Sequence, residues 1–278
     1  MSITMEGVIK KIKSIPKRIY RKIESSIYQL GAYSRTIKIL NAWETEEYLK
    51  KHVLSFCRFG DGEFAIMNGE SIAFQEYDRE LAEKLLEILC RQEEGVLVGI
   101  NYVYLNPVSN VNEYTQKFLH SLAKQRKFLL KNCNKEMLYI DAGFTQMYQN
   151  YDDYDFDMHF HNLQQLFLGK DITLICGENV LKNLKYNALD VCNSVDYIFA
   201  PSMNAYSQYD EIMEMALKIS KNRIICIILG PTAKVLVHDL HKLGYIAWDI
   251  GHYLKDYDAY KKKQPKTDQD IENFFRPD

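Results

Sequence analysis

The stretch Ile224-Ile225-Cys226-Ile227-Ile228-Leu229-Gly230-Pro231-Thr232 indicates the fold of this chain more directly than any other. Its apolar, mostly β-branched run is typical of a strand buried on both faces of a sheet. Gly230 permits a tight turn, Pro231 suits the first turn of a helix, and an amphipathic stretch then continues to about Gly244. A strand that leads directly into a helix is the repeating unit of an α/β fold.

The same alternation continues along the chain from residue 44 onward. Near-continuous apolar strands separated by helices predict an α/β fold with a mostly parallel sheet and helices on both faces. The expected strands are Val53–Phe56, Val96–Ile100, Met137–Ile140, Ile172–Cys176, Tyr197–Ala200, Ile224–Leu229 and Tyr245–Trp248, and the expected helices lie near 78–91, 111–132, 158–168, 206–220 and 232–243.

Composition places the protein among ordinary globular proteins, since 47% of its 278 residues are hydrophobic and 26% are charged. We expect a basic amphipathic N-terminal helical segment (1–43), a main domain (44–260) and a polar C-terminal tail (261–278). The net charge of −2 gives no support for a nucleic-acid partner. Six cysteines without a CxxC pair predict free thiols in a reducing cytoplasm. No apolar run is long enough to predict a membrane span.

The N-terminal segment has a character of its own. Basic residues crowd residues 10–22 without an acid among them, and apolar residues recur every three or four positions from Val8 to Ile27, around Pro16 as a break or kink. One interpretation is peripheral contact of residues 1–30 with an anionic membrane surface, at the inner face of the cell membrane. The other is a helix that packs on the domain with a solvated basic face.

Chemistry-bearing residues gather where the predicted strands end, which is where α/β sheets bind ligands. The segment Arg58-Phe59-Gly60-Asp61-Gly62-Glu63 follows the first strand. Asp61 and Glu63 are suited to a hard divalent cation, and Arg58 to phosphate. Gly60 and Gly62 permit positive φ and close approach of a ligand. This segment predicts a site for a metal and a diphosphate, although an ordinary polar turn has the same residues.

Two later strand ends carry further candidates. Gly230, Pro231 and Thr232 open a helix whose free N–H groups suit phosphate, although they also make a good helix start. Asp249 and His252 follow the last strand as an acid–base or metal-ligand pair, or as a simple hydrogen bond. Alternating acids and histidines over residues 153–161 also suggest metal ligands, but we prefer the start of a helix there because acids stabilise a first turn.

Four of these motifs, in this order, resemble the GT-D-fold bacterial glycosyltransferases over about residues 45–258. The resemblance is carried by Arg58–Glu63 with Phe74-Gln75, by Pro201–Tyr206 with Tyr209-Asp210, by Leu229–Ala233 with Leu243-Gly244-Tyr245, and by Asp249-Ile250-Gly251-His252.

The resemblance implies a Rossmann-like α/β fold of the GT-D type. It also implies transfer of a sugar from a nucleotide diphosphate donor, often UDP-glucose, to a glycan or glycoconjugate acceptor that is lipid-linked or protein-linked. It implies that Asp61 and Glu63, the family's Asp-x-Glu motif, serve the divalent metal (Mn²⁺ or Mg²⁺) and the donor. The catalytic base is then sought in His252 or Asp249. The chain departs from the family at Gly143–Tyr148, where an Arg-Pro pair is expected, and after Cys176-Gly177-Glu178, which leaves the donor sugar open.

Two other classes of function compete with this one. A Rossmann dehydrogenase is disfavoured because no convincing G-x-G-x-x-G follows the first strand. A non-catalytic protein that binds sugar or a membrane surface through its basic N-terminus remains the alternative.

Overall fold

The computed structural model describes residues 16–91 and 93–276 and confirms the predicted α/β class. Its eight strands form one parallel sheet in the order β1-β4-β3-β2-β8-β7-β5-β6. The strands are β1 (Lys38–Ile39), β2 (Ser55–Phe59), β3 (Val96–Ile100), β4 (Leu138–Asp141), β5 (Asp171–Cys176), β6 (Ser194–Phe199), β7 (Ile224–Ile228) and β8 (Ala247–Asp249).

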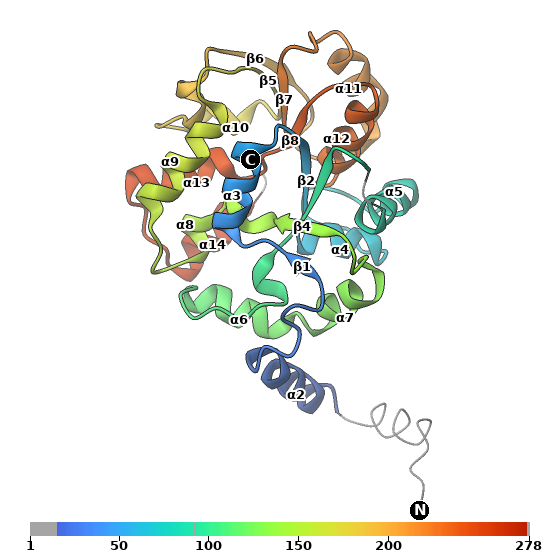
Figure 1. Cartoon of the computed structure of the whole chain (residues 1–278), viewed down its shortest axis with the longest axis vertical. Coiled ribbons are helices and arrows are strands. Elements are labelled where there is room, and N and C mark those ends of the chain that lie inside the picture. Colours follow the sequence, from blue (N-terminus) through green and yellow to red (C-terminus); the bar gives the residue numbers. More distant parts are fainter. Residues whose placement is uncertain (1–15, 92, 277–278) are drawn as a thin grey trace, which may run out of the picture.

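Helices cover both faces of the sheet (Figure 1). On one face lie α5 (Arg79–Cys90), α11 (Tyr209–Ala216) and α12 (Thr232–Lys242), and on the other lie α3 (Ala42–Lys51), α9 (Phe156–Phe167) and α13 (Tyr253–Lys262). In β2 the side chains of Cys57 and Phe59 pack in the hydrophobic core beneath α5, α11 and α12, and that of Phe56 packs in the core beneath α3, α9 and α13. Because both faces are covered at the centre of the sheet, β2, β3 and β7 are buried along most of their length, whereas the edge strand β6 is partly exposed.

Other helices lie between or after these elements along the chain. They are α4 (Asp61–Met67), α6 (Glu113–Ser121), α7 (Ala123–Asn132), α8 (Met147–Asn150), α10 (Asn179–Lys182) and α14 (Asp268–Phe274), with 3₁₀ turns η1 (Tyr102–Tyr104), η2 (Ala142–Thr145), η3 (Ala188–Val191) and η4 (Ala205–Gln208). The helix expected over 111–132 is divided into α6 and α7 at Leu122.

The structure differs from the expectation at both ends of the chain. Residues 38–39, expected within a helical segment, form strand β1 beside β4. Residues 261–278 were expected to be a solvated tail, but α14 packs there with Ile271 and Phe274 buried. Ile271 and Phe274 are three residues apart, which places them on one face of a helix. This pattern is too short to predict a helix beside the lysine-rich stretch that precedes it.

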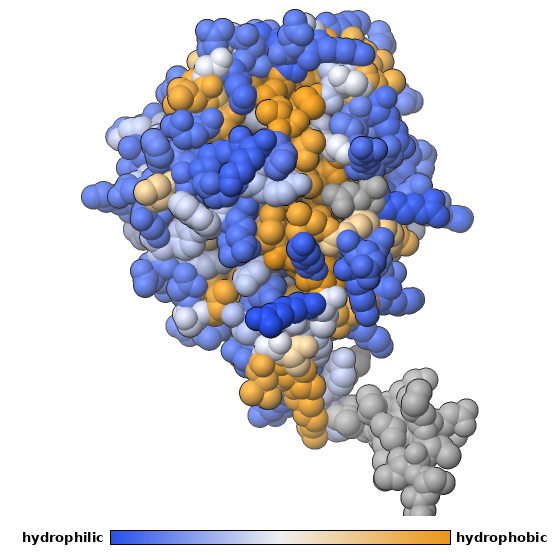
Figure 2. Space-filling model, in the orientation of Figure 1, coloured by the Kyte–Doolittle hydropathy of each residue, from blue (hydrophilic) through white to orange (hydrophobic). Residues whose placement is uncertain are grey.

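Helix α2 (Lys17–Gln29) lies beyond the β1 end of the sheet and has an exposed apolar face (Figures 1 and 2). Ile19, Ile23, Ile27 and Leu30 are all exposed. Its inner side is tied to the domain by Glu24, which forms a buried ion pair with Arg126 of α7. The part of the N-terminal pattern before Pro16 lies outside the described residues. None of the helices over 16–91 and 93–276 is both long and apolar enough to cross a membrane.

The acid- and histidine-rich stretch after residue 152 leads into helix α9, which agrees with the helix start that we preferred to a metal site. Asp155 is the N-cap of α9, and its side chain accepts a hydrogen bond from the backbone N–H of Met158 at 2.9 Å. His159 points into the core, where Nδ1 lies 2.6 Å from Glu46. Asp155 and His159 therefore have structural roles, as a helix cap and as a buried hydrogen-bond partner of Glu46.

Candidate active site

A cavity of about 420 Å³ lies at the carboxyl ends of the strands. Strands β2 and β8 are neighbours at the centre of the sheet. Strands β3 and β4 lie on the β2 side of this pair, and β7, β5 and β6 lie on the β8 side. Loops diverge at such a switch point and leave a crevice, which is the usual ligand site of an open α/β sheet. The cavity is lined there by the Arg58–Glu63 segment after β2 and by Asp249, Gly251 and His252 after β8.

Arg58 ties together three strand ends. Its Nε donates to the backbone oxygen of Asp249 at 2.8 Å, Nη1 donates to the backbone oxygen of Ala142 at 2.9 Å, and Nη2 lies 3.4 Å from Asp249 Oδ1. The side chain is buried. Arg58 thus lies in the cavity wall, but its contacts hold β2, β4 and β8 in place, and phosphate binding by Arg58 stays a prediction.

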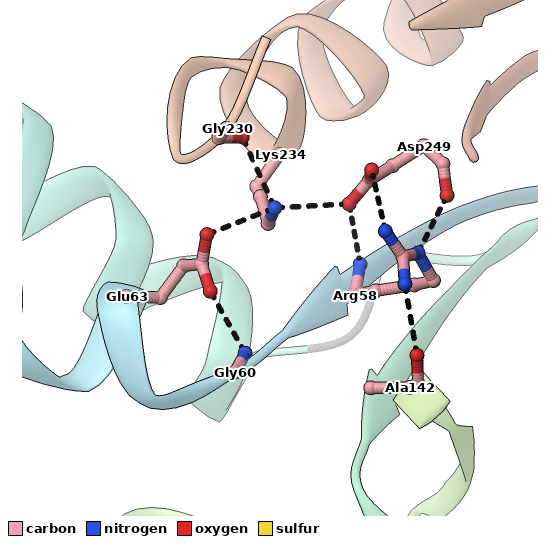
Figure 3. Close-up of polar contacts among 7 residues, drawn as sticks. All are labelled: Arg58, Gly60, Glu63, Ala142, Gly230, Lys234 and Asp249. Carbon is pink, nitrogen blue, oxygen red and sulfur yellow. Dashed lines mark hydrogen bonds and ion pairs between the residues drawn. The ribbon is translucent and has the colours of Figure 1, made fainter. Parts of the chain in front are cut away.

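Lys234 joins the two candidate segments, and sequence reasoning missed it (Figure 3). Its ammonium group lies 2.9 Å from Glu63 Oε1 and 3.1 Å from Asp249 Oδ2, and it donates to the backbone oxygen of Gly230 at 3.0 Å. Burial opposes the charge of Lys234, but Asp249 and Glu63 outweigh this and raise its pKa. An ammonium group has three N–H donors, so these contacts saturate it. In the sequence, Lys234 could have been noticed because it lies four residues after Gly230, in the first turn of α12 and so close to the strand ends.

The two carboxylates of the Asp-x-Glu motif are in different states. Glu63 Oε2 accepts the backbone N–H of Gly60 at 2.8 Å and Oε1 meets Lys234, so Glu63 is fixed in place. Asp61 opens into the cavity and has no ion pair among the residues that the structure describes. Partial desolvation and then the neighbouring Glu63 raise the pKa of Asp61.

The glycines that line the cavity differ in backbone conformation. Gly60 and Gly62 do not have positive φ, contrary to the reason that the sequence suggested. A Cβ on Gly62 would lie 3.2 Å from Ile72 Cδ1, so close packing of α4 explains this glycine better. Gly230 does have a φ of +52°, and a Cβ there would lie 3.2 Å from the ring of Phe74.

The helix start after β7 contributes less to the cavity than expected. Gly230 lines it, whereas Pro231 and Thr232 are not among the lining residues. Thr232 is fully buried at the first position of α12. Phosphate binding by its N–H group therefore stays a prediction, and Gly230 is the residue of this turn that a ligand in the cavity would meet.

Asp249 and His252, the predicted base candidates, both lie in the cavity wall. Asp249 is buried between Lys234 and Arg58; burial opposes its charge, but these two cations lower its pKa. The pKa of His252 falls to about 3, because of burial and then the nearby positive charges of Lys255, Arg58 and Lys234. An efficient base has a pKa near the working pH. Their catalytic roles stay predictions, but both electrostatic environments favour positioning over proton transfer.

The opposite side of the cavity supplies residues that the sequence did not suggest. Asp141 ends β4 and lines the cavity together with Asn101 after β3. Phe275 and Arg276, beyond α14, close another side. Asp141 could have been predicted from the sequence, because ligands bind at the carboxyl ends of the strands and Asp141 is the last residue of β4.

Known proteins share this architecture. The model of the family described as glycosyltransferase GT-D fold matches residues 56–273. A solved structure described as a highly conserved domain of unknown function 1792 with a distinct glycosyltransferase fold has 32% identity and a TM-score of 0.79, covering 86% of each chain. A glycosyltransferase of that domain type from Streptococcus sanguinis has 30% identity and a TM-score of 0.77, covering 82% of this chain and 85% of that one.

Two curated relatives are longer proteins. A probable glycosyl transferase Gly of Streptococcus gordonii is 31% identical over 82% of this chain and 33% of its own length. The glycosyltransferase GlyD of Streptococcus pneumoniae is 26% identical over 81% of this chain and 28% of its own length. The chain thus spans about a third of these relatives. The family match over most of the chain, together with the fold and the strand-end cavity, shows that this protein belongs to the glycosyltransferase GT-D fold family.

Proposed function

We propose that this protein transfers a hexose from a UDP-sugar to a hydroxyl group of a glycan, in bacterial surface polysaccharide or glycoprotein assembly. One observation carries the proposal. Asp61 presents a carboxylate without an ion pair, among the described residues, at the switch point of the sheet, beside a second carboxylate that Lys234 and Gly60 hold in place. Family membership supports the reaction class.

The Asp-x-Glu carboxylates fit a divalent cation, Mn²⁺ or Mg²⁺, that shares its ligands with the donor. Such ions are commonly held by one or two carboxylates and by substrate phosphates. Asp61 would bind directly, and Glu63 would contribute through its remaining lone pairs or through water, because each of its oxygens already accepts one hydrogen bond. The ion supplies Lewis-acid stabilisation of the departing diphosphate.

Two buried cations, Arg58 and Lys234, lie in the cavity wall next to this site. Negative charge grows on the diphosphate as its bond to the sugar breaks, and fixed positive groups stabilise it without reorganisation. Asp249 holds both Arg58 and Lys234 in place, but Glu63 and Asp249 compensate their charges, so the divalent cation would supply the additional positive charge. Gly230 lines the same wall.

We further propose that α2 brings the protein to the inner face of the cell membrane, where lipid-linked acceptors are assembled. Ile19, Ile23 and Ile27 repeat every four residues on the exposed face, and Arg18 and Arg21 are exposed on the same helix. An apolar face flanked by basic residues suits the boundary of an anionic bilayer. The described cysteines are all free thiols, in keeping with a reducing cytoplasm.

The donor and the cation are tested together by a thermal-shift panel of nucleotide sugars with Mn²⁺, Mg²⁺ or EDTA. A ligand that binds the native state raises the stability by RT ln(1 + [L]/Kd), so the correct UDP-hexose should raise Tm only with the cation. We expect Asp61→Ala to abolish this shift. Asp190→Ala, an exposed aspartate outside the cavity, is the matched control.

Release of UDP in the presence of acceptor glycans then tests turnover. Stabilisation by no nucleotide sugar under any cation would contradict the proposal, and binding to anionic vesicles without such stabilisation would favour the non-catalytic alternative. For α2, Ile23→Glu should weaken binding to phosphatidylserine vesicles and leave UDP-sugar binding unchanged. Unchanged vesicle binding would refute the membrane role of α2.

A further inference from the structure

We propose that Asp141, at the end of β4, accepts the proton of the acceptor hydroxyl. This inference rests on the proposed function and adds to it the residue that activates the nucleophile. Neither the cation ligands Asp61 and Glu63 nor the pair Asp249 and His252 is suited to that task in this structure.

The ion pairs of the cavity separate its carboxylates into two kinds. Of the four that line it, Glu63 and Asp249 are bound to Lys234 or Arg58 and are charge-compensated. Asp61 and Asp141 have no ion pair within the described residues. Asp61 belongs to the proposed cation site, so Asp141 is the carboxylate left to exchange a proton.

Local hydrogen bonds hold Asp141 in one orientation. Its Oδ1 accepts the backbone N–H groups of Tyr102 at 2.9 Å and of Gly143 at 2.8 Å, and its own N–H donates to Thr45 Oγ1 at 2.9 Å. No hydrogen bond from the described part of the chain reaches Oδ2. One oxygen is therefore a structural acceptor, as in an ordinary turn cap, and the other is left for a ligand.

Gly143 keeps the approach to this carboxylate open. A Cβ there would lie 3.2 Å and 3.6 Å from the two carboxylate oxygens of Asp141 and 2.7 Å from Asn101 Oδ1. Both Asn101 and Gly143 line the cavity. A residue larger than glycine would thus occupy the space beside the proposed base, although the backbone of Gly143 has no positive φ.

The electrostatic environment suits proton exchange near neutral pH. Burial raises the pKa of Asp141 to about 6, and the negative charge of Glu46 adds to this increase. The two backbone N–H groups and Arg58 lower the pKa, but their effect is smaller than that of burial. Asp141 also interacts electrostatically with three tyrosines of η1 and of the loop before α9. They are Tyr102, Tyr151 and Tyr154, and all three stay neutral because their pKa values are raised.

The step balances as a single displacement. The acceptor oxygen forms a bond to the anomeric carbon while the bond from that carbon to the diphosphate breaks and its electron pair leaves with UDP. The hydroxyl proton passes to Asp141 Oδ2 and later to water. The products are the glycosylated acceptor, UDP and one proton, and the configuration at the anomeric carbon is inverted.

The test is Asp141→Asn, because the amide oxygen of asparagine can still accept both N–H groups that hold Oδ1. We expect the UDP-sugar and Mn²⁺ thermal shift to stay at the wild-type value and kcat to fall by about 10²–10⁴-fold, the range for loss of a general base. The wild-type kcat/KM should rise with pH through about 6. This rise should disappear in the variant.

Two results would overturn the proposal even if the variant fails to fold. One is a wild-type pH profile without an acidic limb near pH 6, and the other is retained anomeric configuration in the product, measured by NMR. A folded Asp141→Asn with wild-type kcat would overturn it as well. Failure of the wild-type protein to bind any nucleotide sugar would instead refute the proposed function.

Discussion

Gly251 leaves the space that the guanidinium group of Arg58 occupies. A Cβ on Gly251 would lie 1.5 Å from Arg58 Nη2, and this glycine has a φ of +43°. The turn after β8 therefore needs glycine for two reasons, the left-handed backbone and the passage of a buried arginine that joins three strand ends.

Gly251→Ala should displace Arg58 and disorganise the cavity floor. The control is Gly69→Ala, because Gly69 has a φ of +85° but no atom lies within 4 Å of the position that an added Cβ would take. Both variants carry the strain of positive φ, about 1 kcal/mol, but only Gly251→Ala adds a clash. We expect it to lower the free energy of unfolding by about 1–3 kcal/mol more than the control does, measured by urea denaturation. Equal losses would show that Arg58 can move at no cost.

Lys234→Met should be among the most damaging single changes in the domain. It leaves the buried carboxylates of Glu63 and Asp249 without their shared cation, which typically costs about 3–5 kcal/mol. Lys242→Met, on the same helix but with a half-exposed side chain, should change the free energy of unfolding by no more than about 0.5 kcal/mol. A small effect of Lys234→Met in urea denaturation would mean that the carboxylates take up protons instead, which a strong pH dependence of stability would reveal.

His252 should stay neutral across the physiological range and make the fold sensitive to acid. Its pKa in the folded protein is about 3, below the ordinary value of 6.5, so the unfolded state binds the proton more readily. The stability due to neutral His252 is complete above about pH 6.5 and is lost as the pH falls toward 3. His252→Leu, beside Phe274 and Phe275, should reduce the loss of stability between pH 7 and pH 5. An imidazole that titrates near pH 6.5 by NMR would contradict this prediction.

Glu24 should anchor α2 through Arg126. The carboxylate meets Nε of Arg126 at 2.5 Å and Nη2 at 3.0 Å, and both side chains are buried. Glu24→Ala leaves the arginine charge unpaired and should cost about 3–5 kcal/mol. Glu113→Ala, which removes an exposed ion pair with Lys117, should cost less than about 1 kcal/mol. Hydrogen exchange of α2 should increase in Glu24→Ala alone, and equal protection in both variants would refute the anchoring role.

Much of the fold was predictable because strand and helix patterns are local. Seven of the strands were expected near their observed positions, since central strands such as Ile224–Ile228 are apolar on both faces and the edge strand β6 still ends in the apolar run Tyr197–Phe199. Strand β1 was not predicted because its two residues form no pattern and only pairing with β4 makes them a strand. Helix α14 was missed because its buried pair, Ile271 and Phe274, is surrounded by polar residues.

The site was predictable only as a set of strand ends. By itself the sequence determined that Asp61, Glu63, Asp249 and His252 would lie at one edge of the sheet, because parallel strands bring their carboxyl ends together. Ion pairing depends on distances across elements far apart in the chain, and these exist only in the folded protein. The tertiary structure alone decided that Lys234 neutralises Glu63 and Asp249, that burial keeps His252 uncharged, and that Asp61 and Asp141 remain without a cation among the described residues.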